Sequence, residues 1–244
     1  MVMPVLGIEA ATDVAGVAVV KEGFLLAERF VNNRHTHSVT ILEMIKGALA
    51  DARVLPRQLS GIAVSTGPGS FTGLRIGLAT ARTLAQVWKL PVAGVGTLEA
   101  LAFTAPAFPG LICPVINAKK NEVYAAVYRN QEEKEKRGLF IVAGPEATDP
   151  AGLAERLRRF ALPVFFTGDG ALFWKPLFLQ HLKELAVFAP PALSLPRGAA
   201  VAFLGWLKLA ANEGCAPDLL FPLYLRPSEA EAKWLKTHPE TKKT

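Results

Sequence analysis

The most constraining feature of the sequence is a glycine-rich turn that joins an apolar strand to a long helix. Residues 61–66 are apolar or β-branched, Gly-Pro-Gly-Ser occupies 67–70, and helical spacing continues over 72–88. A buried strand that turns directly into a helix is typical of a parallel βα unit. The sequence therefore predicts an α/β protein that contains a parallel-sheet unit.

The segments on either side of this unit predict the rest of a first lobe. Short apolar runs indicate a three-stranded meander over 5–11, 16–20 and 24–31. Apolar residues at helical spacing then indicate a helix over 38–53, and a strand with a short helix capped by Thr97 follows over 91–104. We predict a first lobe over residues 1–106 with the element order βββαβαβα.

A second, degenerate lobe is predicted over residues 107–244. A hinge with two prolines and a glycine at 105–110 precedes it. The three-strand opening recurs at 111–117, 123–128 and 139–142, with a charged loop at 131–137. A helix at 153–160, a strand at 164–167, a helix at 199–211 and an extended piece at 221–226 follow, and we expect the C-terminal helix and tail to pack back on the first lobe. Two such lobes joined by a hinge predict the actin, Hsp70 and sugar-kinase architecture, an RNase H-like fold.

Composition indicates a globular protein that stays inside the cell. Hydrophobic residues make up 51% of the 244-residue chain, enough for a sizeable core. The longest apolar runs are shorter than the roughly 18 residues that a membrane span needs, and the N-terminus lacks signal-peptide features. Cys113 and Cys215 lie far apart and outside any C-x-x-C motif. We expect a soluble, cytoplasmic protein with reduced thiols and no membrane association.

The glycine-rich turn has two interpretations at this stage. Backbone amides at the start of the helix, with the hydroxyls of Ser70 and Thr72, form the kind of site that binds phosphate. The turn nevertheless matches neither the P-loop nor the Rossmann fingerprint. In the structural interpretation, Gly67 and Gly69 serve only the backbone conformation, and Ser70 or Thr72 caps the helix. The sequence leaves both interpretations open.

Small residues recur every four positions along the helix that follows: Gly73, Gly77, Ala81 and Ala85. A glycine inside a helix costs about 1 kcal/mol relative to alanine, so two of them predict a close approach by a neighbouring element. That element is either the lobe's own sheet or first helix, or else a helix of a partner chain. The sequence alone does not decide between them.

The histidines do not have the spacing of a metal site. His35 and His37 precede the first helix, but two ligands on one helical face need a separation of four residues, and Ile41 stands four after His37. No G-x-S-x-G motif marks a serine nucleophile either. We predict no catalytic residue and no bound zinc or iron.

The ends of the first strands in both lobes also lack the aspartates that Mg²⁺–ATP chemistry needs. The first strand ends in Glu9, Ala10 and Ala11, and Asn117 stands at the corresponding position of the second lobe. We expect no cofactor, no ATP hydrolysis and no tight Mg²⁺–ATP binding by the chain alone.

Several of these motifs together resemble the TsaB family, and the resemblance covers essentially the whole chain. Its most specific part is Gly-Pro-Gly-Ser-Phe-Thr-Gly-Leu-Arg; the others are Leu6–Thr12, His37-Ser38 with 41–45, Glu122–Tyr124 and Pro222–Arg226. The resemblance implies a bacterial protein needed to make N6-threonylcarbamoyladenosine at position 37 of tRNAs that read codons beginning with A. Most relatives have Asp-Thr-Ser or Asp-Thr-Thr at 9–11 and an aspartate at 117, and this chain departs from both.

The resemblance further implies a noncatalytic partner of TsaD, the metal-bearing catalytic subunit, with the ATPase TsaE as a further partner and tRNA reached only through the complex. TsaD-like chains carry an H-x-x-x-H pair, and Ile41 replaces the second histidine here. The family pairs through its first two helices, so the same helices could also form a homodimer. The implied interface residues are His37, Ile41, Met44, Ile45, Ala48, Thr72, Gly73, Ile76, Gly77, Thr80, Ala81 and Leu84.

Two other functions compete with this one. The first is an ATP-dependent phosphotransferase of the sugar-kinase or acetate-kinase type, which nucleotide titration would reveal. The second is a direct tRNA-binding module, which needs basic and aromatic residues on one surface. The net charge of +6 is spread along the chain, and the small cluster of Arg156, Arg158 and Arg159 is explained by a solvated helix face.

Overall fold

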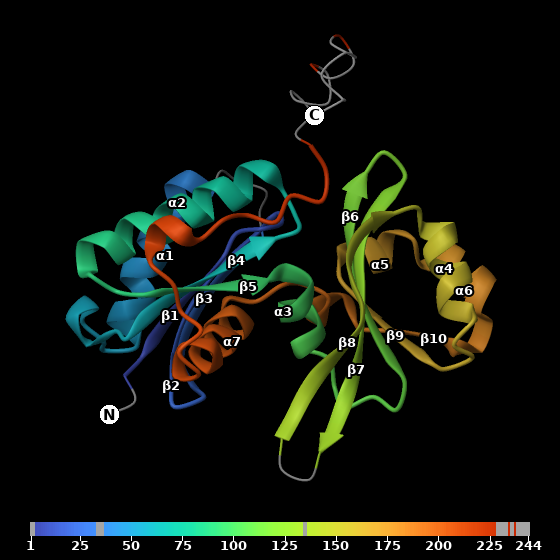
Figure 1. The fold of residues 1–244 in the computed structure, drawn as a ribbon, viewed down its shortest axis with the longest axis horizontal. Helices are drawn as coiled ribbons and strands as arrows, with labels where there is room; N and C mark the ends of the chain where they lie inside the picture. Colours follow the sequence, from blue (N-terminus) through green and yellow to red (C-terminus); the bar gives the residue numbers. More distant parts are fainter. Residues whose placement is uncertain (1–2, 33–36, 134–135, 228–233, 235–236, 238–244) are drawn as a thin grey trace.

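The computed structural model describes residues 3–32, 37–133, 136–227, 234 and 237. Among them it places two five-stranded mixed sheets, each flanked by helices (Figure 1). The strands of the first sheet, in spatial order, are β3 (Phe24–Asn32), β2 (Val14–Lys21), β1 (Val5–Glu9), β4 (Gly61–Gly67) and β5 (Val92–Gly96). Those of the second are β10 (Ala186–Phe188), β9 (Val164–Thr167), β6 (Leu111–Lys119), β7 (Glu122–Glu133) and β8 (Lys136–Thr148).

Both sheets begin with an antiparallel meander and continue with parallel strands. In the first sheet β1 pairs antiparallel with β2 and parallel with β4; in the second β6 pairs antiparallel with β7 and parallel with β9. The repeated meander and the two-lobed α/β architecture predicted from the sequence are confirmed. All of β1 is buried, because helices cover both faces of the first sheet.

Helices lie on both sides of the first sheet and along the outer side of the second. On the first sheet, α1 (His37–Asp51) and α2 (Phe71–Trp88) cover one face, and α7 (Gly198–Ala210) covers the other. α3 (Thr97–Phe103) packs between the sheets, while α4 (Pro150–Arg158), α5 (Asp169–Phe173) and α6 (Lys175–Leu182) belong to the second. Among the described residues, no helix combines the length and the apolar character that crossing a membrane requires.

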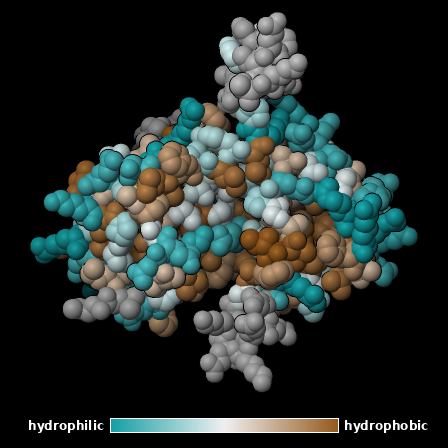
Figure 2. Space-filling view, in the orientation of Figure 1, coloured by the Kyte–Doolittle hydropathy of each residue, from teal (hydrophilic) through white to brown (hydrophobic). Residues whose placement is uncertain are grey.

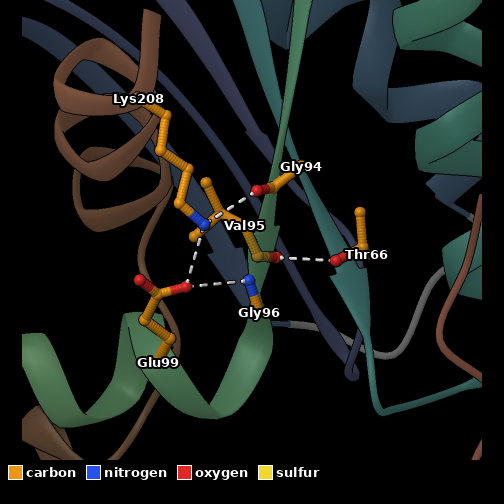
Figure 3. Close-up of polar contacts among 6 residues, drawn as sticks. All are labelled: Thr66, Gly94, Val95, Gly96, Glu99 and Lys208. Carbon is orange, nitrogen blue, oxygen red and sulfur yellow. Dashed lines mark hydrogen bonds and ion pairs between the residues drawn. The ribbon is translucent and has the colours of Figure 1, made fainter. Parts of the chain in front are cut away.

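The last helix, α7, packs on the first sheet although the second sheet precedes it in the chain. A Cβ on Gly7 would overlap Ala202, and a Cβ on Gly205 would overlap Ala63, so helix and sheet are in close contact. Figure 3 shows Lys208 of α7 donating to the carbonyl oxygen of Gly94 at 3.1 Å and to Glu99 at 3.2 Å. The predicted second lobe thus gives its last helix to the first sheet.

The extended segment after α7 also returns to the first sheet, as predicted for 221–226. We call residues 217–226 the C-terminal strap. Its amide at Leu223 donates to the carbonyl oxygen of Thr66 at 2.7 Å, and Leu220 is buried in the core of the first lobe. Arg82 of α2 donates to the carbonyl oxygens of Asp218 and Leu220, which holds the strap along the helix.

Several short or exposed elements differ from the sequence prediction. α5, α6 and β10 were not predicted, because each is too short to show a periodicity. The segment 131–137 was predicted as a loop, but β7 continues to Glu133 and β8 begins at Lys136, with these two residues paired. A hairpin that projects outward buries neither face in a core, so its strands do not need alternating apolar residues, and the charged sequence did not indicate strands. The cap residue of α3 is Gly96, one position before the predicted Thr97.

The stripe of small residues on α2 faces the chain's own sheet. Gly73, Gly77, Ala81 and Ala85 are all buried. A Cβ on Gly77 would lie 3.1 Å from the Cβ of Ala10 and 3.7 Å from a methyl group of Val64. The close approach that the two glycines predicted therefore occurs between α2 and strands β1 and β4.

Replacing Gly77 with leucine is expected to lower the free energy of unfolding by about 2 kcal/mol or more, because the side chain would force α2 away from the sheet. Ala79→Leu, which adds a side chain at an exposed position of the same helix, is the matched control and should leave stability nearly unchanged. Urea denaturation followed by circular dichroism measures both. Equal stability of the two variants would contradict this packing.

Candidate functional site

The backbone groups of the glycine-rich turn between β4 and α2 make their contacts with other parts of the same chain. The amide of Ser70 donates to the carbonyl oxygen of Ala11 at 2.6 Å, and the hydroxyl of Ser70 accepts from the amide of Gly73 at 3.3 Å. Ser70, rather than Thr72, is therefore the N-cap of α2. A Cβ on Gly69 would overlap the carbonyl oxygen of Ala11. These contacts favour the structural interpretation of the turn.

Gly67 is constrained in two ways. Its φ of 110° lies in a region that side chains rarely adopt. A Cβ at this position would also lie 2.7 Å from the carbonyl oxygen of Leu223 in the C-terminal strap. The turn is thus enclosed by the end of β1 on one side and by the strap on the other.

Glu9 is a fully buried carboxylic acid at the end of β1. It accepts a hydrogen bond from the amide of Ala11 at 2.6 Å, and the neighbouring Ser65 accepts from the amide of Ala10 at 3.3 Å. Burial raises the pKa of Glu9 to about 7, and hydrogen bonds from Ala11 and Ser65 only partly oppose this shift. Below that pH the side chain is uncharged, so it offers no strong ligand for a cation.

A cleft of about 420 Å³ separates the two lobes. Asp13 and Asn32 line it from the first lobe, and Ile116 and Asp169 line it from the second. Asp169 accepts from the amide of Asn117 at 3.3 Å; desolvation raises its pKa above the usual value, and the charge of Asp13 acts in the same direction. Two carboxylates therefore face one cleft.

The sequence prediction did not include this pair, because neither aspartate stands at the end of the first strand of its lobe. Asp169 follows β9 and begins α5, so only the folded chain brings it opposite Asp13. Within the part of the chain that the structure describes, no group of three or more His, Cys, Asp or Glu side chains is arranged to hold a metal ion. The absence of a metal and of a cofactor stays a prediction.

The residues predicted for the partner interface fall into two groups. The first group is buried in the core of the first lobe in this conformation and consists of Ile41, Met44, Ile45, Ala48, Gly73, Gly77 and Ala81. A role of these residues in partner contact stays a prediction. The second group remains exposed or half-buried and consists of Thr72, Ile76, Thr80 and Leu84. His37 begins α1, and its side chain lies outside the described part.

The outer sides of α1 and α2 nevertheless carry apolar side chains that remain partly exposed in the described part of the structure. Leu42 on α1 is 53% exposed and Val87 on α2 is 70% exposed, while Ile76 and Leu84 of α2 are half-buried and pack against the core of the first lobe. α1 and α2 lie side by side on this face of the first sheet (Figure 1). We call the surface formed by these four residues the α1–α2 face. It is the candidate partner-binding site.

Replacing Gly69 with alanine is expected to lower the free energy of unfolding by about 2 kcal/mol, because the new methyl group overlaps the carbonyl oxygen of Ala11. Gly144→Ala is the control, since a Cβ there meets no atom within 4 Å. Thermal denaturation measures both variants. A Gly69→Ala protein that is as stable as the parent but has lost activity in the complex would favour the anion-binding interpretation of the turn.

The raised pKa of Glu9 makes stability depend on pH. Between pH 4.5 and about 7 the folded chain keeps a proton on Glu9 that the unfolded chain releases, so stability falls as pH rises through this window and levels off above it. The total loss is about 3 kcal/mol.

Glu9→Gln should therefore be more stable than the parent at pH 8 and close to it at pH 5, as measured by urea denaturation at both values. The exposed substitution Glu184→Gln is the control and should not alter the pH profile. An unchanged profile in Glu9→Gln would show that another group causes the pH dependence.

Known proteins resemble the chain over nearly its whole length. The family model described as "TsaD: tRNA N6-adenosine threonylcarbamoyltransferase" matches residues 25–234. The "tRNA threonylcarbamoyladenosine biosynthesis protein TsaB" of Bacillus subtilis is 34% identical, with 96% of this chain and 99% of the relative aligned. Its Escherichia coli counterpart is 30% identical, with 95% and 98% aligned.

A solved structure agrees with these sequence matches. The structure titled "YeaZ from Pseudomonas aeruginosa" superposes with a TM-score of 0.77 at 25% identity, covering 91% of this chain and 100% of that one. Together with the confirmed two-lobed fold, these matches show that the chain belongs to the TsaB family of tRNA threonylcarbamoyladenosine biosynthesis proteins.

Proposed function

We propose that this chain is a noncatalytic cytoplasmic subunit that binds and supports a TsaD-like catalytic subunit during synthesis of N6-threonylcarbamoyladenosine at position 37 of tRNA. The observation that carries the proposal is the α1–α2 face, where Leu42 and Val87 remain exposed on two packed helices. Exposed apolar side chains on adjacent helices suit a partner that buries them.

The match to the TsaD family model supports a partner of related fold. A partner with the same fold carries an equivalent pair of helices on its first sheet, and the two pairs can pack against each other about a pseudo-twofold axis. A second copy of this chain offers the same face, so a homodimer and the heterodimer would compete for it. A TsaE-like ATPase would join the assembled pair.

The end of β1 supports a noncatalytic role. Ala10 and Ala11 are buried methyl groups, Glu9 is largely uncharged below pH 7, and the amide of Ser70 is already bonded to Ala11. A triphosphate at this end of the sheet would meet apolar groups and occupied amides rather than free donors.

The competing function, an ATP-dependent phosphotransferase, has one observation in its favour, the pair Asp13 and Asp169 that faces the cleft between the lobes. Calorimetric titration of the purified chain with Mg²⁺–ATP separates the two functions. The proposed function requires no binding at micromolar concentration, whereas stoichiometric binding that is lost in Asp169→Asn would support the phosphotransferase.

The α1–α2 face is tested by Leu42→Glu and Val87→Glu, which place a charge on the surface that the partner covers. Each is expected to weaken association with the TsaD-like subunit of the same organism at least tenfold, or about 1.4 kcal/mol, because the carboxylate is desolvated without a partner. Calorimetry with both proteins measures the affinity, and circular dichroism checks the fold.

Leu207→Glu is the matched control, since Leu207 is 44% exposed on α7 at the opposite face of the same sheet. It should bind the partner normally. Normal binding by both Leu42→Glu and Val87→Glu would place the interface elsewhere on the molecule.

A further inference from the structure

Three segments that are far apart in the sequence meet between the two lobes, beside the first turn of α2. They are the glycine-rich turn with the start of α2, the turn between β6 and β7, and the C-terminal strap. Leu223 of the strap bonds to Thr66, and Arg226 donates to the carbonyl oxygen of Ala118 at 3.1 Å and pairs with Glu122 at 2.6 Å. Figure 1 shows the strap passing between α2 and the end of β6.

An aromatic stack stands at this meeting point. The rings of Phe71 and Tyr224 are stacked with their centroids 4.6 Å apart, and the guanidinium of Arg75 lies over the Phe71 ring at 4.0 Å. The hydroxyl of Tyr224 also accepts a hydrogen bond from Arg75 at 3.4 Å. Tyr224 keeps 38% of its surface exposed, and Arg75 is exposed as well.

Basic side chains lie on the neighbouring turn. Lys119 and Lys120 are both exposed at the junction of β6 and β7, next to Ala118, which Arg226 contacts. Glu122, an acidic residue of the same turn, is paired with Arg226. In Figure 2 hydrophilic residues cover this end of β6, and hydrophobic residues lie close by, between the lobes.

We propose that this junction surface, formed by Phe71, Arg75, Lys119, Lys120 and Tyr224, binds single-stranded RNA. The inference rests on the proposed function, which brings the chain to tRNA, but it adds a direct contact where an indirect one was expected. The exposed part of the Tyr224 ring takes a stacked base, while Arg75 and the two lysines contact phosphates.

Charge and chemistry favour RNA over an acidic protein surface as the occupant. A protein interface is typically depleted of lysine, whereas a lysine pair beside a stacked aromatic–arginine group matches the alternation of base and phosphate along a strand. The sequence alone does not reveal this surface, because its residues lie far apart along the chain; Arg75 and Tyr224, for example, are separated by 149 positions.

The test measures fluorescence anisotropy of a labelled hairpin RNA with the sequence of a tRNA anticodon arm, with a fully paired duplex of the same length as the competitor. It is run on the full chain and on its complex with the TsaD-like subunit. We expect the hairpin to bind more tightly than the duplex, with an affinity that falls as salt rises.

Four variants locate the site. Arg75→Gln, the double variant Lys119→Gln/Lys120→Gln, and Tyr224→Leu should each weaken hairpin binding about tenfold, whereas Tyr224→Phe, which keeps the ring, should retain most of it. The lysine variant should also reduce the steepness of the salt dependence. Arg159→Gln, which removes one exposed charge at the C-cap of α4, is the matched control and should bind normally.

The outcomes separate this inference from the proposed function. If the variants of the junction surface bind the hairpin RNA with the same affinity as Arg159→Gln, the inference is wrong even when partner binding is intact. Equal affinities for the hairpin and the duplex would also show that it is wrong. If these variants lose the TsaD-like subunit and keep RNA, the surface belongs to the protein interface and the inference is again wrong. Loss of hairpin binding with normal partner affinity and normal melting temperature supports it.

Discussion

The packing of α2 on the first sheet is the contact on which the other features depend. Gly77 places a hydrogen where any side chain would meet Ala10, and Ala81 and Ala85 continue the same buried stripe. The two glycines cost helix stability, and close contact with β1 and β4 offsets that cost. With the helix held this close, the turn before it presses onto Ala11, and the end of β1 is closed by backbone and methyl groups.

The C-terminal strap completes this arrangement from the other side. It crosses α2, closes over Gly67 and reaches the second lobe through Arg226, so one segment contacts both lobes and the glycine-rich turn. The motifs that carried the family resemblance at the turn, at 122–124 and at 222–226 are thus neighbours in space.

The parts of the fold that depend on local sequence could be predicted, and those that depend on distant contacts could not. The meanders, the strand before the turn and the cap at Ser70 follow from alternation, β-branched residues and a hydroxyl at a helix start. Periodicity also showed that α2 has a small-residue stripe. It could not show which neighbour covers it, because a partner helix and the chain's own sheet impose the same spacing. That Asp13 and Asp169 line the same cleft could be learned only from the tertiary structure, because they lie far apart in the sequence.

The inward direction of the stripe changes how a partner must bind. A partner helix cannot reach the backbone of α2 at Gly77, so contact has to be made through the side chains that project outward, such as Val87 and the half-buried Leu84. Gly77 and Arg75 lie on nearly opposite sides of the helix, since successive residues turn by about 100°. One helix therefore presents a side for the sheet, another for a partner and a third, at its first turn, for the junction with the strap. Because these sides share few residues, a change on one can leave the other two intact, so stability can vary separately from the proposed partner binding and the proposed RNA contact.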